Sequence, residues 1–139
     1  MARRVVGKIV RERAKFKTAF GVPDAREVRD KALTEAQWAT TVEGLLDAYG
    51  WRWCHFRPAR TERGWRTAIS GKKGFPDYAA ARDSLGYFGP ARFILLELKS
   101  ESGRMSPEQQ EWHDMLKAAG AEVIVARPSD YERLVEVLK

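Results

Sequence analysis

Two carboxylates and a lysine stand where apolar segments of the chain meet polar ones. Glu97 and Lys99 close an apolar run over residues 93–96, and Asp77 directly precedes a second apolar stretch at 78–81. Alternate residues of a β-strand share a face, so Glu97 and Lys99 project to the same side, about 7 Å apart along the strand. Charges at the end of a buried strand are costly unless something binds them. These residues predict a site for a divalent metal beside a phosphate.

Such a site suits the hydrolysis of a phosphodiester. The reaction needs a nucleophilic water and compensation for the charge on the phosphoryl and leaving oxygens, and hard oxygen ligands favour Mg²⁺, with Mn²⁺ as a substitute. Asp77 and Glu97 would supply carboxylates, and the backbone carbonyl of Leu98 a third oxygen. Lys99 would either hold the attacking water or offset developing negative charge. The sequence leaves these two roles of the lysine open.

Other interpretations of the polar residues lead away from catalysis. Asp77 after a proline is also typical of a turn, and Glu97 with Lys99 of a solvated pair at a strand end. His55 is expected to be a packed or half-exposed polar residue, His113 a surface residue and Cys54 a core residue. No Cys/His spacing predicts zinc. The glycines and lysines at 71–74 lack the Lys-Ser/Thr of a nucleotide-binding loop, so ATP dependence is not expected.

A helix is predicted to begin after Thr34, which forms a Thr-x-x-Gln capping signature, and to end at Gly50. At 100° per residue, Glu35 lies close to the centre of the apolar stripe, whereas Glu43 lies well away from it and should be solvated. The stripe consists of Trp38, Val42, Leu45, Leu46 and Tyr49.

The remaining elements predict an α/β fold with a mixed central sheet flanked by helices on both faces. Ser106, with a proline after it and Gln109 at the third helical position, opens a second helix, in which Gln109 leans inward. A final helix is capped at Ser129. We expect strands at 51–57, 77–82, 92–99 and 123–126, a loop without a core pattern at 58–74, and an apolar face formed by Trp112, Met115, Leu116 and Ala119.

Positive charge is concentrated in two segments. Residues 1–31 carry ten Lys/Arg against four Asp/Glu, and residues 52–73 carry seven against one, so each segment has a net charge of +6, equal to that of the whole chain. Such segments indicate contact with a polyanion. Cations in or next to the second segment are expected to bind a DNA backbone without reading its sequence, and Trp65 to stack on a displaced base. The expected DNA-binding residues are Arg57, Arg60, Arg63, Arg66, Lys72, Lys73 and, further along the chain, Arg104.

The motifs resemble a known family. Gly-x-Pro-Asp at 74–77, Glu-x-Lys at 97–99 and Gly-Arg-x-Ser-Pro-Glu-Gln at 103–109 are similar to those of the VRR-NUC family of the PD-(D/E)xK nuclease superfamily. The resemblance covers about residues 34–139. It implies a restriction-endonuclease-like αβββαβ core, with Glu35 as an outer or second-metal carboxylate and Gln109 as a polar partner of Lys99 or the water. We therefore divide the chain into a basic N-terminal arm, 1–31, and a VRR-NUC-like nuclease domain, 32–139.

The function that the resemblance implies is a Mg²⁺-dependent, structure-selective DNA endonuclease. Its substrate would be a Holliday junction or other branched DNA, as for the stand-alone, virus-type members, which tend to dimerise; a homodimer would match the twofold symmetry of a four-way junction. A non-catalytic DNA-binding module, and nicking or exonuclease activity on simple duplex DNA, remain alternatives. The single cysteine and the absence of a long apolar run predict a cytoplasmic protein without a membrane span, acting in a host cytoplasm if virus-encoded.

Overall fold

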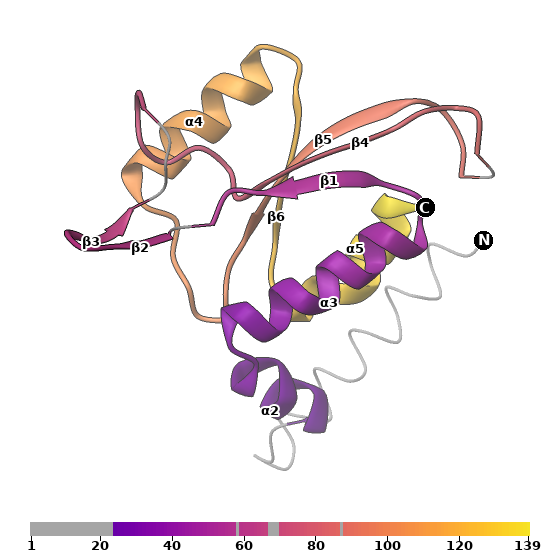
Figure 1. The fold of residues 1–139 in the computed structure, drawn as a ribbon. Helices are drawn as coiled ribbons and strands as arrows, with labels where there is room; N and C mark the ends of the chain where they lie inside the picture. The colour runs from indigo at the N-terminus through magenta and orange to yellow at the C-terminus, as the bar shows by residue number, and fades with distance from the viewer. Residues whose placement is uncertain (1–23, 58, 67–69, 87) are drawn as a thin grey trace.

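The computed structural model describes residues 24–57, 59–66, 70–86 and 88–139, which form an α/β fold (Figure 1). The elements, in chain order, are α2 (Ala25–Ala32), α3 (Glu35–Ala48), β1 (Arg52–His55), β2 (Ala59–Thr61), β3 (Gly64–Arg66), β4 (Tyr78–Arg82), β5 (Arg92–Leu98), α4 (Pro107–Ala118), β6 (Glu122–Ala126), the 3₁₀ turn η1 (Pro128–Asp130) and α5 (Tyr131–Leu138). The αβββαβ order of a restriction-endonuclease-like core is present, with the hairpin β2–β3 added to it.

The central sheet is mixed and has the strand order β1-β4-β5-β6. β4 pairs antiparallel with both β1 and β5, and β6 pairs parallel with β5. Figure 1 shows α3 and α5 together on one side of this sheet and α4 on the other. The predicted mixed sheet flanked by helices is therefore confirmed.

Helix α3 begins where its sequence predicts and contributes four residues to the core cluster. Thr34 and Gln37 form a reciprocal capping box, in which the Thr34 hydroxyl accepts from the Gln37 N–H and the Gln37 side chain accepts from the Thr34 N–H. Trp38, Val42 and Leu46 of the predicted stripe are buried. The indole of Trp38 also donates a hydrogen bond of 3.0 Å to the carbonyl of Ala126, which ties α3 to the end of β6.

Strand β5 is the centre of the sheet and is covered on both faces. All residues from Ile94 to Leu98 are buried, although alternate side chains point to opposite faces. Ile94, Leu96 and Leu98 belong to the core cluster that α3 and α5 complete. A charged side chain in this strand is therefore buried, unless the helix that covers its face leaves it exposed to solvent.

Several expectations about local structure are wrong. The segment 58–74 was expected to be a loop, but it contains the hairpin β2–β3. Cys54 is exposed, because it lies on the face of β1 opposite the core. On α4, Met115 and Ala119 are exposed, and His113 is buried instead. The final helix starts at Tyr131, after a 3₁₀ turn, rather than at the predicted cap Ser129.

Residues 1–23 of the predicted basic arm lie outside the described residues. The remainder of that arm includes α2, whose Asp30 is buried and whose Arg26 pairs with Glu132 of α5 at 2.8 Å. The boundary between arm and domain stays a prediction. In the described ranges of the chain, no helix is long and apolar enough to cross a membrane.

The buried stripe of α3 leads to a stability prediction. Leu46→Ala should lower the free energy of unfolding by about 2–5 kcal/mol, because the side chain is fully buried and its removal leaves a cavity. Leu85→Ala, which truncates a highly exposed leucine in the β4–β5 turn, should change it by less than about 0.5 kcal/mol. Urea denaturation of both variants measures the difference; equal losses would contradict the assigned core.

Candidate active site

The antiparallel register of β4 and β5 brings the two predicted carboxylates together. Tyr78 pairs with Leu96, so Asp77, one residue before β4, lies opposite Glu97, and opposite residues of an antiparallel pair share a face. The backbone N–H of Leu98 donates a hydrogen bond of 2.9 Å to Oδ2 of Asp77. The predicted convergence of Asp77 and Glu97 is thus present at the end of both strands.

Lys99 and Gln109 meet on the same carboxylate oxygen. Nζ of Lys99 lies 2.7 Å from Oε1 of Glu97, and the side-chain amide of Gln109 donates a hydrogen bond to that oxygen. The other end of the Gln109 amide accepts from the N–H of Ser106 at 2.9 Å and completes the capping box of α4. Gln109 therefore caps the helix and contacts the site at once, and its partner is Glu97 rather than Lys99.

Burial dominates the electrostatics of the two acids. The side chain of Glu97 is 0% exposed, and this burial raises its pKa from 4.5 to about 7, even though the hydrogen bond from Lys99 acts to lower it. The nearby charges of Asp77 and Glu35 raise the Glu97 pKa further. Burial also raises the pKa of Asp77, against the hydrogen bond from Leu98 and the charge of Lys99. Two carboxylates in this environment favour a cation beside them.

The donor set fits a hard divalent cation. Oε2 of Glu97 is buried and accepts no hydrogen bond, which leaves a carboxylate oxygen with its full desolvation cost. Asp77 and Leu98, which flank Glu97 in space and in sequence, line a cavity of about 570 Å³. Among the described residues, no group of three or more His, Cys, Asp or Glu side chains could hold a metal by itself. A Mg²⁺ site here would rely on two carboxylates, a backbone carbonyl and water, which is typical of that ion.

Glu35 is placed differently from the prediction. It is the first residue of α3 and is exposed instead of leaning onto the core, because the helix start extends beyond the sheet. It nevertheless lines the same cavity as Asp77, and its charge acts on the pKa of both Asp77 and Glu97. An outer position is the one that this geometry allows.

His113 was expected at the surface and is instead 1% exposed, facing Glu97 from α4. Its Nε2 lies 4.0 Å from Oε2 of Glu97, which is too long for a hydrogen bond, and both atoms lack a hydrogen-bond partner. Burial lowers the pKa of His113, so the pair is not a strong ion pair. The spacing of four residues from Gln109 was the signal in the sequence, since such residues share a helix face.

Glu43 was expected to be solvated but is largely buried in a polar network. Its Oε1 accepts from the hydroxyl of Tyr78 at 2.8 Å and from the guanidinium of Arg57 at 3.0 Å, and His55 lies 3.3 Å away. Burial acts to raise the pKa of Glu43, but the hydrogen bonds from Tyr78, Arg57 and His55 outweigh it and hold the pKa below its usual value. The His55 ring stacks on Tyr78, with centroids 3.9 Å apart. These partners lie in other segments of the same chain, so the helical periodicity around Glu43 could not reveal them.

The predicted DNA-binding cations lie on both sides of the carboxylates. Arg57 lines the cavity beside Asp77. Lys72 and Lys73 lie against α4, and Lys73 pairs with Glu108 at 2.8 Å. Arg104 is exposed in the segment before α4. The hairpin β2–β3 carries Arg60, Arg63 and Arg66, of which Arg63 is exposed at the turn; the side chains of Arg60, Arg66 and Trp65 are outside the described part of the structure.

A mixed sheet with Asp77, Glu97 and Lys99 at the ends of adjacent strands defines a restriction-endonuclease-like class of protein. The family model for the VRR-NUC domain matches residues 52–130, more than half of the chain. The chain belongs to the VRR-NUC family, which implies a nuclease-type, DNA-processing function. No curated protein and no solved structure shows a significant match to it.

The raised pKa of Glu97 leads to a pH prediction for the metal-free protein. Between about pH 4.5 and 7 the folded state holds a proton on Glu97 that the unfolded state has released, so stability falls as the pH rises through this window. The loss attributable to Glu97 should be up to about 3 kcal/mol. Denaturation in EDTA at several pH values measures it.

Glu97→Gln is the matched control, because the amide cannot titrate and Asp77 keeps its own contribution. The variant should lose stability less steeply over the same window. Parallel curves for the wild type and the variant would contradict the assignment of the raised pKa to Glu97.

Proposed function

We propose that this chain is a Mg²⁺-dependent DNA endonuclease that favours branched DNA, such as a Holliday junction or a flap, with Mn²⁺ as a substitute metal. One observation carries the proposal: Asp77 and Glu97 lie opposite each other at the end of two strands, and Lys99 contacts Glu97 at 2.7 Å. A buried glutamate and a partly buried aspartate, with an ammonium beside the glutamate, suit metal-assisted phosphodiester hydrolysis. Membership of the VRR-NUC family supports the same reaction class.

Asp77, Glu97 and the carbonyl of Leu98 would hold the metal, and Glu35 would act as an outer ligand from the rim of the cavity. The cation, when bound, would polarise the phosphate and lower the pKa of a water molecule. Gln109 keeps Glu97 oriented through its hydrogen bond. His113 and the core side of α4 exclude water from the back of Glu97, which strengthens the electrostatic interactions in front of it.

Lys99 is the residue best placed to act on the phosphate itself. Its side chain is 12% exposed, and its ammonium group contacts the carboxylate of Glu97. From this position it would donate to a phosphoryl oxygen and stabilise the charge that develops there, or hold the attacking water. Both roles require the charged or hydrogen-bonding amine at this point of β5.

Recognition of the DNA would depend on its backbone. Arg57 lines the same cavity as Asp77, Lys72 and Lys73 lie against α4, and Arg104 is exposed before that helix. None of the four lies in a helix that could read a groove. Contacts of this kind bind phosphates irrespective of sequence and weaken with salt. Cations on two sides of the site favour DNA that changes direction at the cut, and a homodimer would present two such sites to a symmetric junction.

Asp77→Asn should abolish Mg²⁺-dependent cleavage while leaving DNA binding largely intact, because the amide retains the shape but loses the charge that holds the metal. Asp83→Asn is the matched control at the other end of β4, and it should cut like the wild type. Gel assays of cleavage and binding on the same labelled junction measure both properties. Full activity of Asp77→Asn would contradict the assigned site.

The substrate preference is tested with labelled junction, flap, nicked and linear DNA. We expect cleavage of junctions or flaps at least about 10-fold faster than cleavage of linear duplex, equivalent to about 1.4 kcal/mol in the barrier. Equal rates would contradict structure selectivity and favour simple nicking or exonuclease activity. Binding without any cleavage in Mg²⁺ or Mn²⁺ would instead identify a non-catalytic DNA-binding module.

A further inference from the structure

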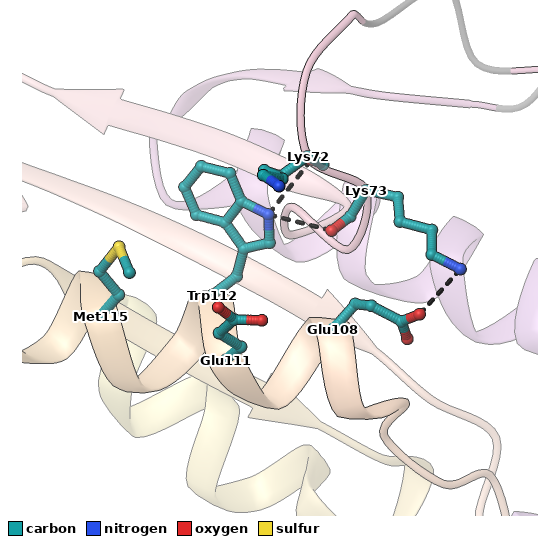
Figure 2. A pocket seen from close by; sticks show the side chains of 6 residues that line it. All are labelled: Lys72, Lys73, Glu108, Glu111, Trp112 and Met115. Carbon is teal, nitrogen blue, oxygen red and sulfur yellow. Dashed lines mark hydrogen bonds and ion pairs between the residues drawn. The ribbon is translucent and has the colours of Figure 1, made fainter.

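A second cavity lies beside the candidate active site, on the outer side of α4. It has a volume of about 330 Å³ and is lined by Lys72, Lys73, Glu108, Glu111, Trp112 and Met115. Figure 2 shows the indole of Trp112 and the side chain of Met115 on neighbouring turns of the helix, with Lys72 beside the indole and the Lys73 side chain extending to Glu108. This volume is within the range of small-ligand sites.

The two chain segments that form this cavity also carry residues of the candidate active site. Glu108, at its rim, precedes Gln109, which contacts Glu97. Gly74 approaches the first turn of α4 so closely that a Cβ there would lie 2.6 Å from the carbonyl carbon of Glu108, and its φ of +96° suits glycine. The chain then runs three residues further to Asp77. A ligand in the cavity would therefore contact the same two segments that carry Gln109 and Asp77.

Trp112 is held as a rigid platform. Its Nε1 donates to the carbonyls of Lys73, at 3.1 Å, and Lys72, at 3.3 Å. The Phe75 ring meets it at an interplanar angle of 90°, with centroids 5.1 Å apart, so it covers at most one face of the indole. Because its polar edge is already bonded, the indole offers a flat apolar face and no hydrogen bond.

The other residues of the cavity indicate which kind of ligand would stack on the Trp112 indole. Met115 is 60% exposed despite its apolar side chain, and a thioether packs well against aromatic rings. Lys72 makes no ion pair with any other described residue, so it can bind a phosphate. The carboxylates of Glu108 and Glu111 disfavour a small free anion but can accept from the amino group of a base. A flat aromatic group joined to a phosphate fits all of these features.

We propose that this cavity binds one unpaired nucleobase of the DNA substrate, stacked on Trp112 and Met115, with Lys72 on the adjacent phosphate. The inference rests on the proposed nuclease function and deepens it, because a flap presents unpaired bases next to the branch, whereas linear duplex and a fully paired four-way junction do not. Stacking on an aromatic ring tolerates any base. The cavity would thus select DNA structure without selecting sequence.

The test is an abasic scan of a labelled flap substrate, in which one base at a time is removed from the unpaired strand near the branch. Binding to the full chain carrying Asp77→Asn is measured by fluorescence anisotropy, so that no cleavage occurs. Removal of the base at one position should weaken binding about 10-fold. At the other unpaired positions it should change binding by less than about 2-fold.

Variants locate the effect in the cavity. Trp112→Leu and Met115→Glu, each made in the Asp77→Asn background, should lose the sensitivity to the abasic position. Leu85→Glu introduces the same charge at an exposed apolar residue in the β4–β5 turn, which lies far from α4 (Figure 1), and it should keep the sensitivity. If circular dichroism shows that Trp112→Leu is not folded, the comparison of abasic sensitivity between Met115→Glu and Leu85→Glu decides the test.

The two hypotheses fail in different ways. Two results would overturn the stacking site even if the wild type cuts flaps in Mg²⁺. One is an abasic scan in which no position weakens binding. The other is a position whose base still contributes to binding in Met115→Glu. Failure of the wild type to bind branched DNA would overturn both this inference and the proposed function. A flap bound by the Asp77→Asn chain but never cut by the wild type would remove only the catalytic part.

Discussion

Burial of the Glu97 carboxylate is the constraint on which the rest of this structure depends. A side chain that is 0% exposed at the end of a central strand has a pKa of about 7, so its charged form is stable only with compensation. Lys99 and Gln109 provide part of it on one oxygen, and the other oxygen has none. A divalent cation shared with Asp77 would complete it. The cost of an unpaired acid is thus linked to the function that we propose.

Helix α4 connects this constraint to the surface. Its capping box places Gln109 on Glu97, the next turn puts His113 behind the carboxylate, and the adjacent side of the helix carries Trp112 and Met115. The N-terminal turn of the helix is locked to the segment 72–74 by close backbone packing and by the Trp112 hydrogen bonds. One helix therefore supports both the Glu97 carboxylate, which we propose binds the metal, and the proposed base-stacking cavity, and a change in its position would affect both.

Local signals predicted a large part of this arrangement. Both capping boxes, the buried stripe of α3, the four sheet strands and the shared face of Glu97 and Lys99 follow from period, caps and residue type. The errors have a common cause. Met115 and His113 were assigned by hydrophobicity, but the covering of α4 is set by its rotation on the sheet, which turned the histidine inward. The burial of Glu43 and Cys54 was predicted only from the pattern of the helix or strand that carries each residue, whereas their burial depends on how other elements pack against them.

By itself, the sequence determined the α/β class, the residues of the acid–lysine site and the VRR-NUC membership, because each depends on motifs or short-range periodicity. The tertiary structure alone decided that Gln109 binds Glu97 rather than Lys99, that Glu35 lies at the rim, and that Trp112 faces a cavity. These features depend on strand register and on how a helix is rotated against a sheet. Both arise from packing between segments that are distant along the chain, which no local pattern encodes.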